Sequence, residues 1–470
     1  MNQKIKINTP NILLITIDSL RYDHLGCYGY HRNTSSNIDA LAARGVKFLQ
    51  AISNGGQTPQ AFPAILESAL PPVEGSWIKP IARHSTTLAE VFKNAGYRTA
   101  AFHSNPLLSR FYGYSKGFNV FDDSYHQMKR WRARIHIRMI ARSLRKSMPK
   151  LVDKASSMLG PTLTRVLDRP IINANEINNK ATSWLQINSE RFFLWLHYMD
   201  VHYPYMPEAK YLKQYCNLSI SRGQMKALRH KMMRRPSELS QAEIEMLINL
   251  YDADIKYTDE VVGSLLSKLG SCLENTIVFV TADHGDAFGE HGRFGHNTVY
   301  DELLHVPLII AGPGIEGGTV IKQQVSLIDL APTIVELAGL KSPSSFQGRS
   351  LLPMVEGKEE IEAGTISTII PFGARQRGFD ISYRIPGWKY ICDESLNDGS
   401  LLGEEVYDLR NDPGETNNLH GEGDGEANSF ELEARKKIAQ FKQLKAEGKT
   451  DYEKAAVKAK MKSLKKSGRI

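Results

Sequence analysis

The chain has 470 residues, which is long enough to bury a large core and longer than one typical domain. We therefore expect one large domain with a smaller one attached. Hydrophobic residues make up 41% of the sequence and charged residues 23%, which excludes a disordered or fibrous chain. The net charge of +8 is uneven, because residues 129–150 carry nine Lys or Arg residues and no acid.

Buried strands alternate with helical stretches along most of the chain. We predict strands at residues 11–17, 98–102, 192–196 and 276–281, and a helix at residues 86–95. This alternation predicts an α/β fold with a mostly parallel sheet and helices on both faces. Ligands of such sheets bind at the carboxyl ends of the strands, so we expect Asp18, Asp200 and Asp283, which close three of these strands, to converge.

The basic run lies in a predicted insertion at about residues 126–170. The first interpretation of this run is a solvated surface helix. Trp131, Ile135 and Met139 interleave apolar side chains with the arginines, so a helix lying on an anionic membrane surface is the better functional interpretation. No nucleic-acid motif accompanies the run.

The sequence pattern changes near residue 365, where short strand-like segments are separated by turns containing Gly, Asp and Asn. We predict a catalytic α/β domain at residues 8–360, which includes the insertion, and a small C-terminal α+β subdomain at residues 361–446. The subdomain consists of an antiparallel sheet and a helix at residues 428–446. A Lys-rich tail, residues 447–470, is expected to fray.

Two absences favour the cytoplasm as the compartment. No apolar run reaches the ~18 residues that a membrane span needs, and the amino-terminal apolar stretch resembles a core strand more than a signal peptide. Cys27, Cys216, Cys272 and Cys392 are scattered without a CxxC pair. This spacing fits a reducing environment and argues against a thiolate zinc site.

The string Thr281-Ala282-Asp283-His284-Gly285 could hold a metal. Divalent cations accept carboxylate and imidazole ligands, and Asp18 supplies a second carboxylate at another strand end. We predict that Asp18, Asp283 and His284 bind one divalent cation and leave a coordination position open. The alternative is that Asp283 and His284 only form a polar turn. We assign Ser19, which follows Asp18, as the cap of a helix beginning at Leu20.

Thr58 follows a glycine-rich approach and precedes an apolar helix. A hydroxyl at a helix amino terminus, close to a divalent cation, can act as a nucleophile near neutral pH. The alternative is that Thr58 only caps the helix.

Seven motifs occur in the order found in one known family. They lie at residues 11–29, the helix start at Thr58, and residues 197–204, 283–285, 300–309, 329–333 and 407–415. In these motifs the chain resembles the sulfatases of the alkaline-phosphatase superfamily. The resemblance implies an alkaline-phosphatase-like fold.

The resemblance also implies roles for individual residues. Asp18, Asp283 and His284 fall on metal-ligand positions, and Thr58 falls on the nucleophile position. His202 is similar to the histidine that assists the leaving group, which is a suitable general acid. His296 stands where many sulfatases carry a lysine that holds a substrate oxygen.

Three departures from the family pattern concern the nucleophile string and the metal ligands. Thr58 replaces the usual Cys or Ser of a Cys-x-Pro-x-Arg string, Phe62 replaces its Arg, and Ser19 replaces a second metal-binding Asp. Conversion of a cysteine to formylglycine therefore cannot occur at this position. The resemblance implies Ca²⁺, whereas the ligand set favours Zn²⁺ or Mn²⁺.

These residues predict a metal-dependent hydrolase of sulfate esters that forms a covalent intermediate on Thr58. The substrate would be an ester of a small molecule or a glycan. One alternative is a phosphate mono- or diester hydrolase, or a phospho-group transferase, using the same site. The other is a degenerate, non-catalytic sulfatase-like binding protein.

Overall fold

The computed structural model describes residues 9–71, 81, 85–124, 172–216, 220–358, 363–370, 378–395, 398–422 and 425–466, with backbone alone for 447–466. The predicted basic insertion at residues 126–170 lies outside the described residues. Within the described part of the chain, no helix combines the length and apolar character needed to cross a membrane.

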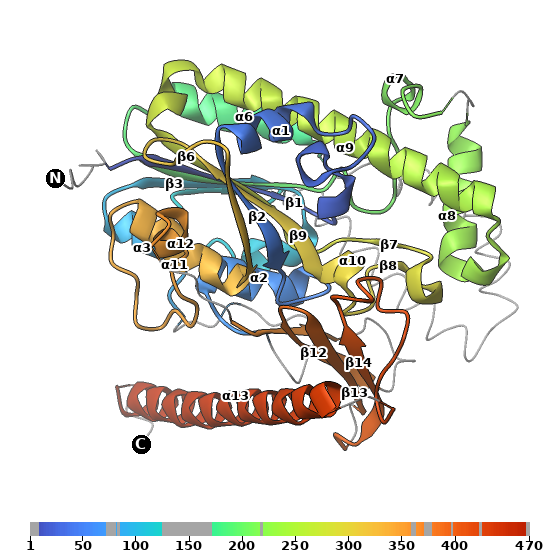
Figure 1. The fold of residues 1–470 in the computed structure, drawn as a ribbon. Helices are drawn as coiled ribbons and strands as arrows, with labels where there is room; N and C mark the ends of the chain where they lie inside the picture. The colour runs from blue at the N-terminus through green and yellow to red at the C-terminus, as the bar shows by residue number, and fades with distance from the viewer. Residues whose placement is uncertain are drawn as a thin grey trace, which may run out of the picture.

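A central sheet of eight strands forms the middle layer (Figure 1). The strand order is β10-β2-β9-β6-β1-β5-β3-β4, and every pairing is parallel except those made by β9. The strands are β1 (Asn11–Ile17), β2 (Gly45–Ile52), β3 (Arg98–His103), β4 (Val120–Asp122), β5 (Phe192–Tyr198), β6 (Thr276–Ala282), β9 (His305–Ala311) and β10 (Thr319–Ser326).

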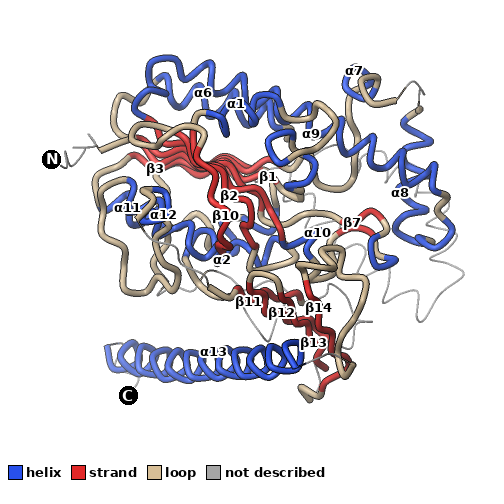
Figure 2. Tube along the Cα trace, in the orientation of Figure 1, coloured by secondary structure: helices blue, strands red, loops and turns tan. Residues whose placement is uncertain are grey.

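Helices cover both faces of this sheet, as Figure 2 shows. One face carries α1 (Ser36–Ala43), α6 (Ala174–Gln186) and α9 (Gln241–Leu269), and α9 packs against the other two. The opposite face carries α2 (Thr58–Glu67), α3 (Leu88–Asn94), α11 (Leu330–Leu337) and α12 (Leu352–Val355). Every residue of β1, β5, β6 and β9 is buried, as expected of strands covered on both faces.

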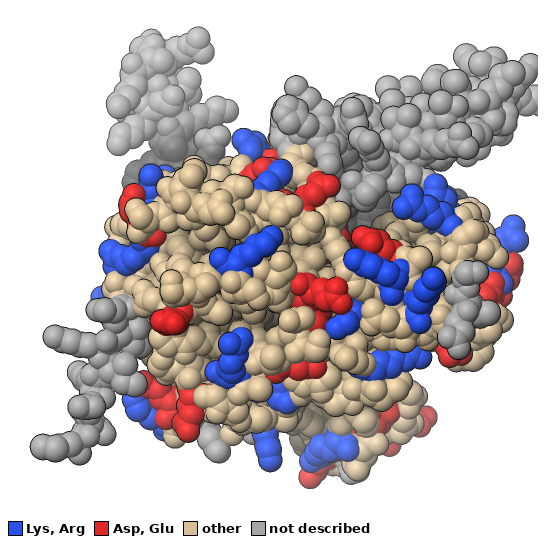
Figure 3. Space-filling view, turned by 90° about the horizontal axis from the view of Figure 1, so that it is seen from above, with Lys and Arg blue, Asp and Glu red and all other residues tan. Residues whose placement is uncertain are grey.

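Smaller elements surround the carboxyl edge of the sheet. These are α7 (Ala209–Leu212), α8 (Arg222–Arg234), the hairpin β7 (Ala287–Phe288) and β8 (Phe294–Gly295), and α10 (Asp301–Leu304). On the face seen in Figure 3, Lys and Arg side chains are interspersed with Asp and Glu side chains.

A second sheet of four antiparallel strands follows. Its strands are β11 (Thr365–Ile369), β12 (Gly378–Ile385), β13 (Trp388–Ser395) and β14 (Leu401–Asp408). Helix α13 (Gly425–Lys466) packs on this sheet through an apolar cluster that includes Phe379, Trp388, Phe430 and Phe441.

The predicted fold class is confirmed, with a mostly parallel sheet, flanking helices, and a small antiparallel sheet followed by a helix. The predicted fraying of the tail is wrong, because α13 continues to Lys466. Residues 451–466 are rich in Lys and Ala, which have high helix propensity.

Candidate active site

Three neighbouring parallel strands bring the candidate residues to one edge of the sheet. Strand β1 lies between β5 and β6, and Ile17 at its end pairs with Tyr198 and Ala282. Asp18 and Asp283 each follow the end of their strand. The topology therefore explains why residues far apart in the sequence meet.

Asp18, Asp283 and His284 form the predicted cluster. All three are completely buried, and each offers a ligand atom within 4.8 Å of the others. His284 Nε2 lies 3.6 Å from Asp18 Oδ1 and 3.7 Å from Asp283 Oδ2. Among the described residues, Asp283 Oδ2 and His284 Nε2 have no hydrogen-bond partner. Buried polar atoms without partners are costly, so their convergence needs an explanation.

The imidazole of His284 is oriented by its backbone neighbour. Its Nδ1 lies 2.8 Å from the carbonyl oxygen of Gly285, which can only accept, so Nδ1 carries a proton; Nε2, which bears a lone pair in the neutral ring, faces the two carboxylates. A lone pair facing carboxylate oxygens is unfavourable without a cation between them. A hydrogen bond to the other ring nitrogen is the usual support of a metal-binding histidine. The three residues therefore fit a divalent cation.

The second carboxylate oxygen of Asp18 is held by several side chains. Asn105 Nδ2 donates to Oδ2 at 3.0 Å, His197 Nε2 lies 3.2 Å away, and the Thr58 hydroxyl donates at 3.4 Å. Burial alone would raise the pKa of Asp18, but nearby histidines, His202 above all, lower that pKa well below its usual range. Asp18 is therefore ionised.

Thr58 is the first residue of α2 and is almost fully buried. The N-cap of this helix is Gln57, so Thr58 is not the cap. Gln57 Nε2 donates to the carbonyl of His296 at 2.9 Å, which ties the helix start to the His296 loop. A Cβ at Gly56 would lie 2.3 Å from the carbonyl oxygen of Thr298, so only glycine permits this close approach.

His202 and His296 lie beside the cluster. Their ring centroids are 4.8 Å apart, and the His296 ring stacks on that of His284 at 4.8 Å. Burial lowers the pKa of His202. Burial also opposes protonation of His296, but the adjacent Asp286, 3.6 Å from His296 Nδ1, outweighs it and raises the pKa of His296. Their surroundings therefore favour the neutral form of His202 and the protonated form of His296.

Phe62 lies behind the site rather than in it. This side chain is completely buried and packs edge-on against the His197 ring at 5.1 Å. It helps to hold His197, whose Nε2 faces Asp18 and whose Nδ1 lies 2.9 Å from Thr16 Oγ1.

Two predictions about neighbouring residues are wrong. Asp200 accepts a hydrogen bond from the backbone N–H of Ala174 at 2.8 Å, at the start of α6, and is not part of the cluster. Ser19 does not cap a helix. Its backbone is in the left-handed region at φ 60°, and its hydroxyl donates to Asp18 Oδ1 at 3.2 Å. The turn after β1 therefore bends Ser19 back toward the carboxylate.

Sequence reasoning missed two residues that contact Asp18. Asn105 follows the end of β3 and His197 lies at the end of β5, so both occupy the same sheet edge as the cluster. His197 stands within a motif that resembles the family but received no role. A polar residue just after a buried strand was the available signal for Asn105.

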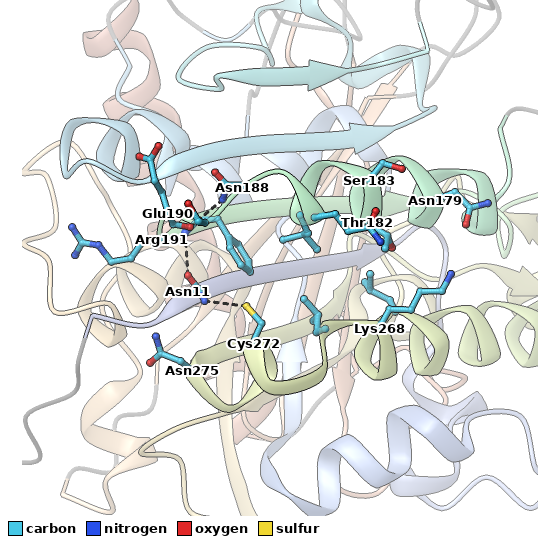
Figure 4. Close-up of a pocket in the computed structure, with 16 residues that line it drawn as sticks. Asn11, Asn179, Thr182, Ser183, Asn188, Glu190, Arg191, Lys268, Cys272 and Asn275 are labelled. Atoms are coloured by element: carbon cyan, nitrogen blue, oxygen red, sulfur yellow. Dashed lines mark hydrogen bonds between the residues drawn. The ribbon is translucent and has the colours of Figure 1, made fainter.

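A cavity of about 820 Å³ lies elsewhere, at the amino end of β1 between α6 and α9 (Figure 4). Its lining includes Asn11, Thr182, Arg191 and Lys268. Asn11 begins the strand that Asp18 follows, so this cavity is separated from the cluster by the length of β1, about 23 Å. It is not the candidate active site.

Comparisons with known proteins agree on one family. A family model described as Sulfatase matches residues 10–340. The uncharacterized sulfatase YidJ of Escherichia coli (strain K12) is 25% identical over 442 residues, covering 87% of this chain and 83% of the relative. Arylsulfatase K of Homo sapiens is 26% identical over 451 residues, covering 87% of this chain and 78% of the relative.

Solved structures share the fold. The BT4656 protein in complex with its substrate D-glucosamine-2-N,6-O-disulfate aligns with a TM-score of 0.70 and 19% identity, covering 93% of this chain and 98% of that chain. The phosphonate monoester hydrolase of Agrobacterium radiobacter aligns with a TM-score of 0.69 and 18% identity, covering 93% of this chain and 96% of that chain.

Proposed function

Because the chain belongs to the sulfatase family of the alkaline-phosphatase superfamily and is a sulfatase-type ester hydrolase, we propose that it hydrolyses a sulfate ester through a covalent intermediate on Thr58. The observation that carries this proposal is the buried Thr58 hydroxyl, 3.4 Å from the Asp18 carboxylate, whose other oxygen faces His284. The Asp18 carboxylate thus contacts both the proposed nucleophile and the metal-ligand cluster.

Asp18, Asp283 and His284 would hold one divalent cation. Such a cation, when bound, withdraws charge from an ester oxygen and lowers the pKa of a hydroxyl beside it. Two carboxylates and one imidazole favour Zn²⁺ or Mn²⁺, since Ca²⁺ prefers six to eight oxygen ligands. Ca²⁺ is the ion that the family resemblance implies, so both classes are tested below.

The chemical step begins at Thr58. Its Oγ1 forms a bond to sulfur while the bond between sulfur and the ester oxygen breaks, and the hydroxyl proton passes to solvent. His202 donates a proton to the departing oxygen, which leaves as an alcohol. Burial lowers the pKa of His202, but the negative charge of an incoming ester favours its protonated form.

The second half of the cycle releases sulfate. Water attacks the sulfur of the Thr58 ester, the bond between sulfur and Oγ1 breaks, and Thr58 recovers its proton. His296 would hold an ester oxygen in both steps, because Asp286 raises its pKa and thereby favours a positive charge.

A phosphate ester is the second candidate substrate, with either hydrolysis or transfer of the phospho group. The threonine nucleophile and the imidazole ligand favour it, and so does the shared fold with a phosphonate monoester hydrolase. A purely non-catalytic binding role is not favoured, because it gives no reason to bury Asp283 Oδ2 and His284 Nε2 without partners.

Parallel kinetics on one preparation test the substrate class. We would strip the protein with a chelator, reload it separately with Zn²⁺, Mn²⁺ and Ca²⁺, and compare kcat/KM for an aryl sulfate, an aryl phosphate and a bis-aryl phosphate. The proposal expects the sulfate to be preferred. A clear preference for either phosphate ester would reject the sulfatase assignment while retaining the site.

The nucleophile is tested by Thr58→Ala with Thr99→Ala as a matched control, since Thr99 is also buried but lies in β3. We expect Thr58→Ala to lower kcat on the order of 10³-fold or more, because the covalent route is lost. Thr99→Ala should retain activity. Mass spectrometry of acid-quenched wild type should detect a sulfated Thr58 peptide. Full turnover by Thr58→Ala would overturn the scheme.

A further inference from the structure

A second group of potential ligands lies next to the turn that carries His284. It consists of His291 in the 3₁₀ turn Glu290–Gly292, Glu302 in α10, and Glu415 after β14. Each offers a ligand atom within 4.8 Å of the others. The three residues come from separate segments, two on the catalytic side and one following the C-terminal sheet.

The carboxylates of this group are deeply buried. The side chain of Glu302 is 7% exposed and that of Glu415 is 1% exposed. Glu302 Oε2 lies 3.9 Å from His291 Nε2, whereas Glu302 Oε1 has no hydrogen-bond partner among the described residues. A buried carboxylate oxygen without a partner is expensive unless a cation or a proton compensates it.

The nearby Arg384 and Lys389 side chains pair with carboxylates other than that of Glu302. Arg384 and Lys389 both bind Asp301, and Lys389 Nζ also lies 2.8 Å from Glu415 Oε1. Among Asp301, Glu302 and Glu415, Glu302 is the carboxylate without an ion pair to either cation.

His291 has an uncommon backbone conformation, and its ring is held by stacking. Its backbone has φ 52°, in the left-handed region, and its ring stacks on Tyr300 with centroids 3.7 Å apart and planes 11° apart. Non-glycine residues adopt this region at a cost, often at functional positions. The stacking leaves Nε2 near the Glu302 carboxylate.

We propose that His291, Glu302 and Glu415 form a second divalent-cation site, separate from the Asp18 cluster. One imidazole and two carboxylates are ligands suited to Zn²⁺. The role would be structural, because the cation would join the Glu290–Gly292 turn, α10 and the segment after β14.

The position also supports the candidate active site. The Gly285 N–H donates to the carbonyl of Leu303 at 2.7 Å, and a Cβ at Gly285 would lie 2.1 Å from the carbonyl oxygen of Glu302. Helix α10 is therefore packed directly against the turn that contains Asp283 and His284. A cation on Glu302 would stiffen the support of that turn.

Zinc stoichiometry of single and double variants tests the proposal on the full chain. After chelator treatment, reloading with Zn²⁺ and gel filtration, we would measure bound zinc by mass spectrometry of the metal. We expect Glu302→Gln and Asp18→Asn each to lose the equivalent of one site, and the double variant to lose both. Glu405→Gln is the matched control, because Glu405 accepts hydrogen bonds from Tyr300 and Tyr407 nearby but is outside the group.

The two sites are separated by their variants, so failure of one proposal is distinct from failure of the other. Zinc that is lost entirely in Asp18→Asn and fully retained in Glu302→Gln would overturn the second site and leave the first intact. If Glu302→Gln does not fold, Co²⁺ added to Asp18→Asn provides the readout. Visible absorption that His291→Gln abolishes supports the site, and no absorption in Asp18→Asn overturns it.

Discussion

The carboxyl edge of the central sheet holds a buried aspartate and the junction between α10 and the C-terminal sheet holds a largely buried one, and the two negative charges are compensated by different means. Asp18 is surrounded by His197, Asn105 and Thr58, none of which carries a permanent charge. Asp301 instead binds Arg384 and Lys389. In both places the neighbours hold the pKa of the aspartate well below its usual range, although burial raises it.

This difference in charge compensation distinguishes the candidate active site around Asp18 from the structural ion pairs of Asp301. At Asp301 two permanent cations pair with the carboxylate itself, whereas the neighbouring Glu302 pairs with neither of them. At the sheet edge, Asp18 and Asp283 share a buried space with imidazoles and neutral donors, and atoms of Asp283 and His284 have no partner among the described residues. Incomplete compensation of buried charge is therefore the feature that marks the candidate active site.

The largest expected effect is on catalysis at the sheet edge. Asp18→Asn keeps the shape of the side chain but removes the charge that would bind the cation. We expect a loss in kcat on the order of 10³-fold and loss of the bound metal, because the cation and Thr58 both depend on this carboxylate. Metal analysis and turnover of the preferred ester measure both effects. Normal metal content with normal turnover would contradict the assignment of Asp18.

The matching change at the junction should affect stability instead. Asp301→Asn removes the carboxylate that Arg384 and Lys389 both bind. Loss of one partner of a buried ion pair lowers the free energy of unfolding by about 3–5 kcal/mol. Urea unfolding measures this cost, and the folded fraction should retain turnover and metal at the Asp18 cluster. If Asp301→Asn unfolds like the wild type but loses turnover, the two regions do not divide their roles as we describe.

A smaller effect is expected from the side chains that orient Asp18. Asn105→Ala removes the donor to Asp18 Oδ2, and His197→Gln removes the ring that faces the same oxygen. Loss of such supporting contacts lowers metal affinity or activity by roughly 10–100-fold. Zinc titrations and kcat/KM on the same variants measure the two quantities. A loss as large as that of Asp18→Asn would indicate that these residues contact the substrate directly.

The sequence predicts the parts of this arrangement that depend on local pattern. Strands β1 and β6 are uninterrupted apolar runs, so their ends at Asp18 and Asp283 are visible without a structure. Strands β2 and β10 carry polar residues such as Lys47 and Gln324 and were not predicted individually. Their sequences do not show the unbroken apolar run of a central strand.

The remaining features depend on strand order, which no local pattern contains. Asn105 and His197 reach Asp18 because β5 lies directly beside β1 and β3 lies beside β5. Glu302 and Glu415 meet because the C-terminal sheet returns to α10. Asp200 shows the converse, since its strand end is predicted correctly but its side chain turns to α6. Residues at one sheet edge need not face one site.

Asp200 extends the comparison to an aspartate that, among the described residues, forms no ion pair with Lys or Arg and lies outside the metal cluster. Its carboxylate accepts a hydrogen bond from the Ala174 N–H, and burial raises its pKa to about 7, above the ordinary value of about 3.9. The folded chain thus holds a proton that the unfolded chain releases. Its contribution to stability is complete below the ordinary pKa and is lost as pH rises through about 7.

Asp200→Asn should therefore stabilise the protein at high pH only. The asparagine oxygen can still accept from Ala174, and no carboxylate needs a proton. We expect the free energy of unfolding to rise by up to a few kcal/mol at about pH 8.5 and hardly at all at about pH 4. Each pKa unit of the shift corresponds to about 1.4 kcal/mol. Urea unfolding of both proteins across this range measures the difference. A gain that does not depend on pH would show that a proton does not compensate Asp200, and the contrast with Asp18 and Asp301 would then fail.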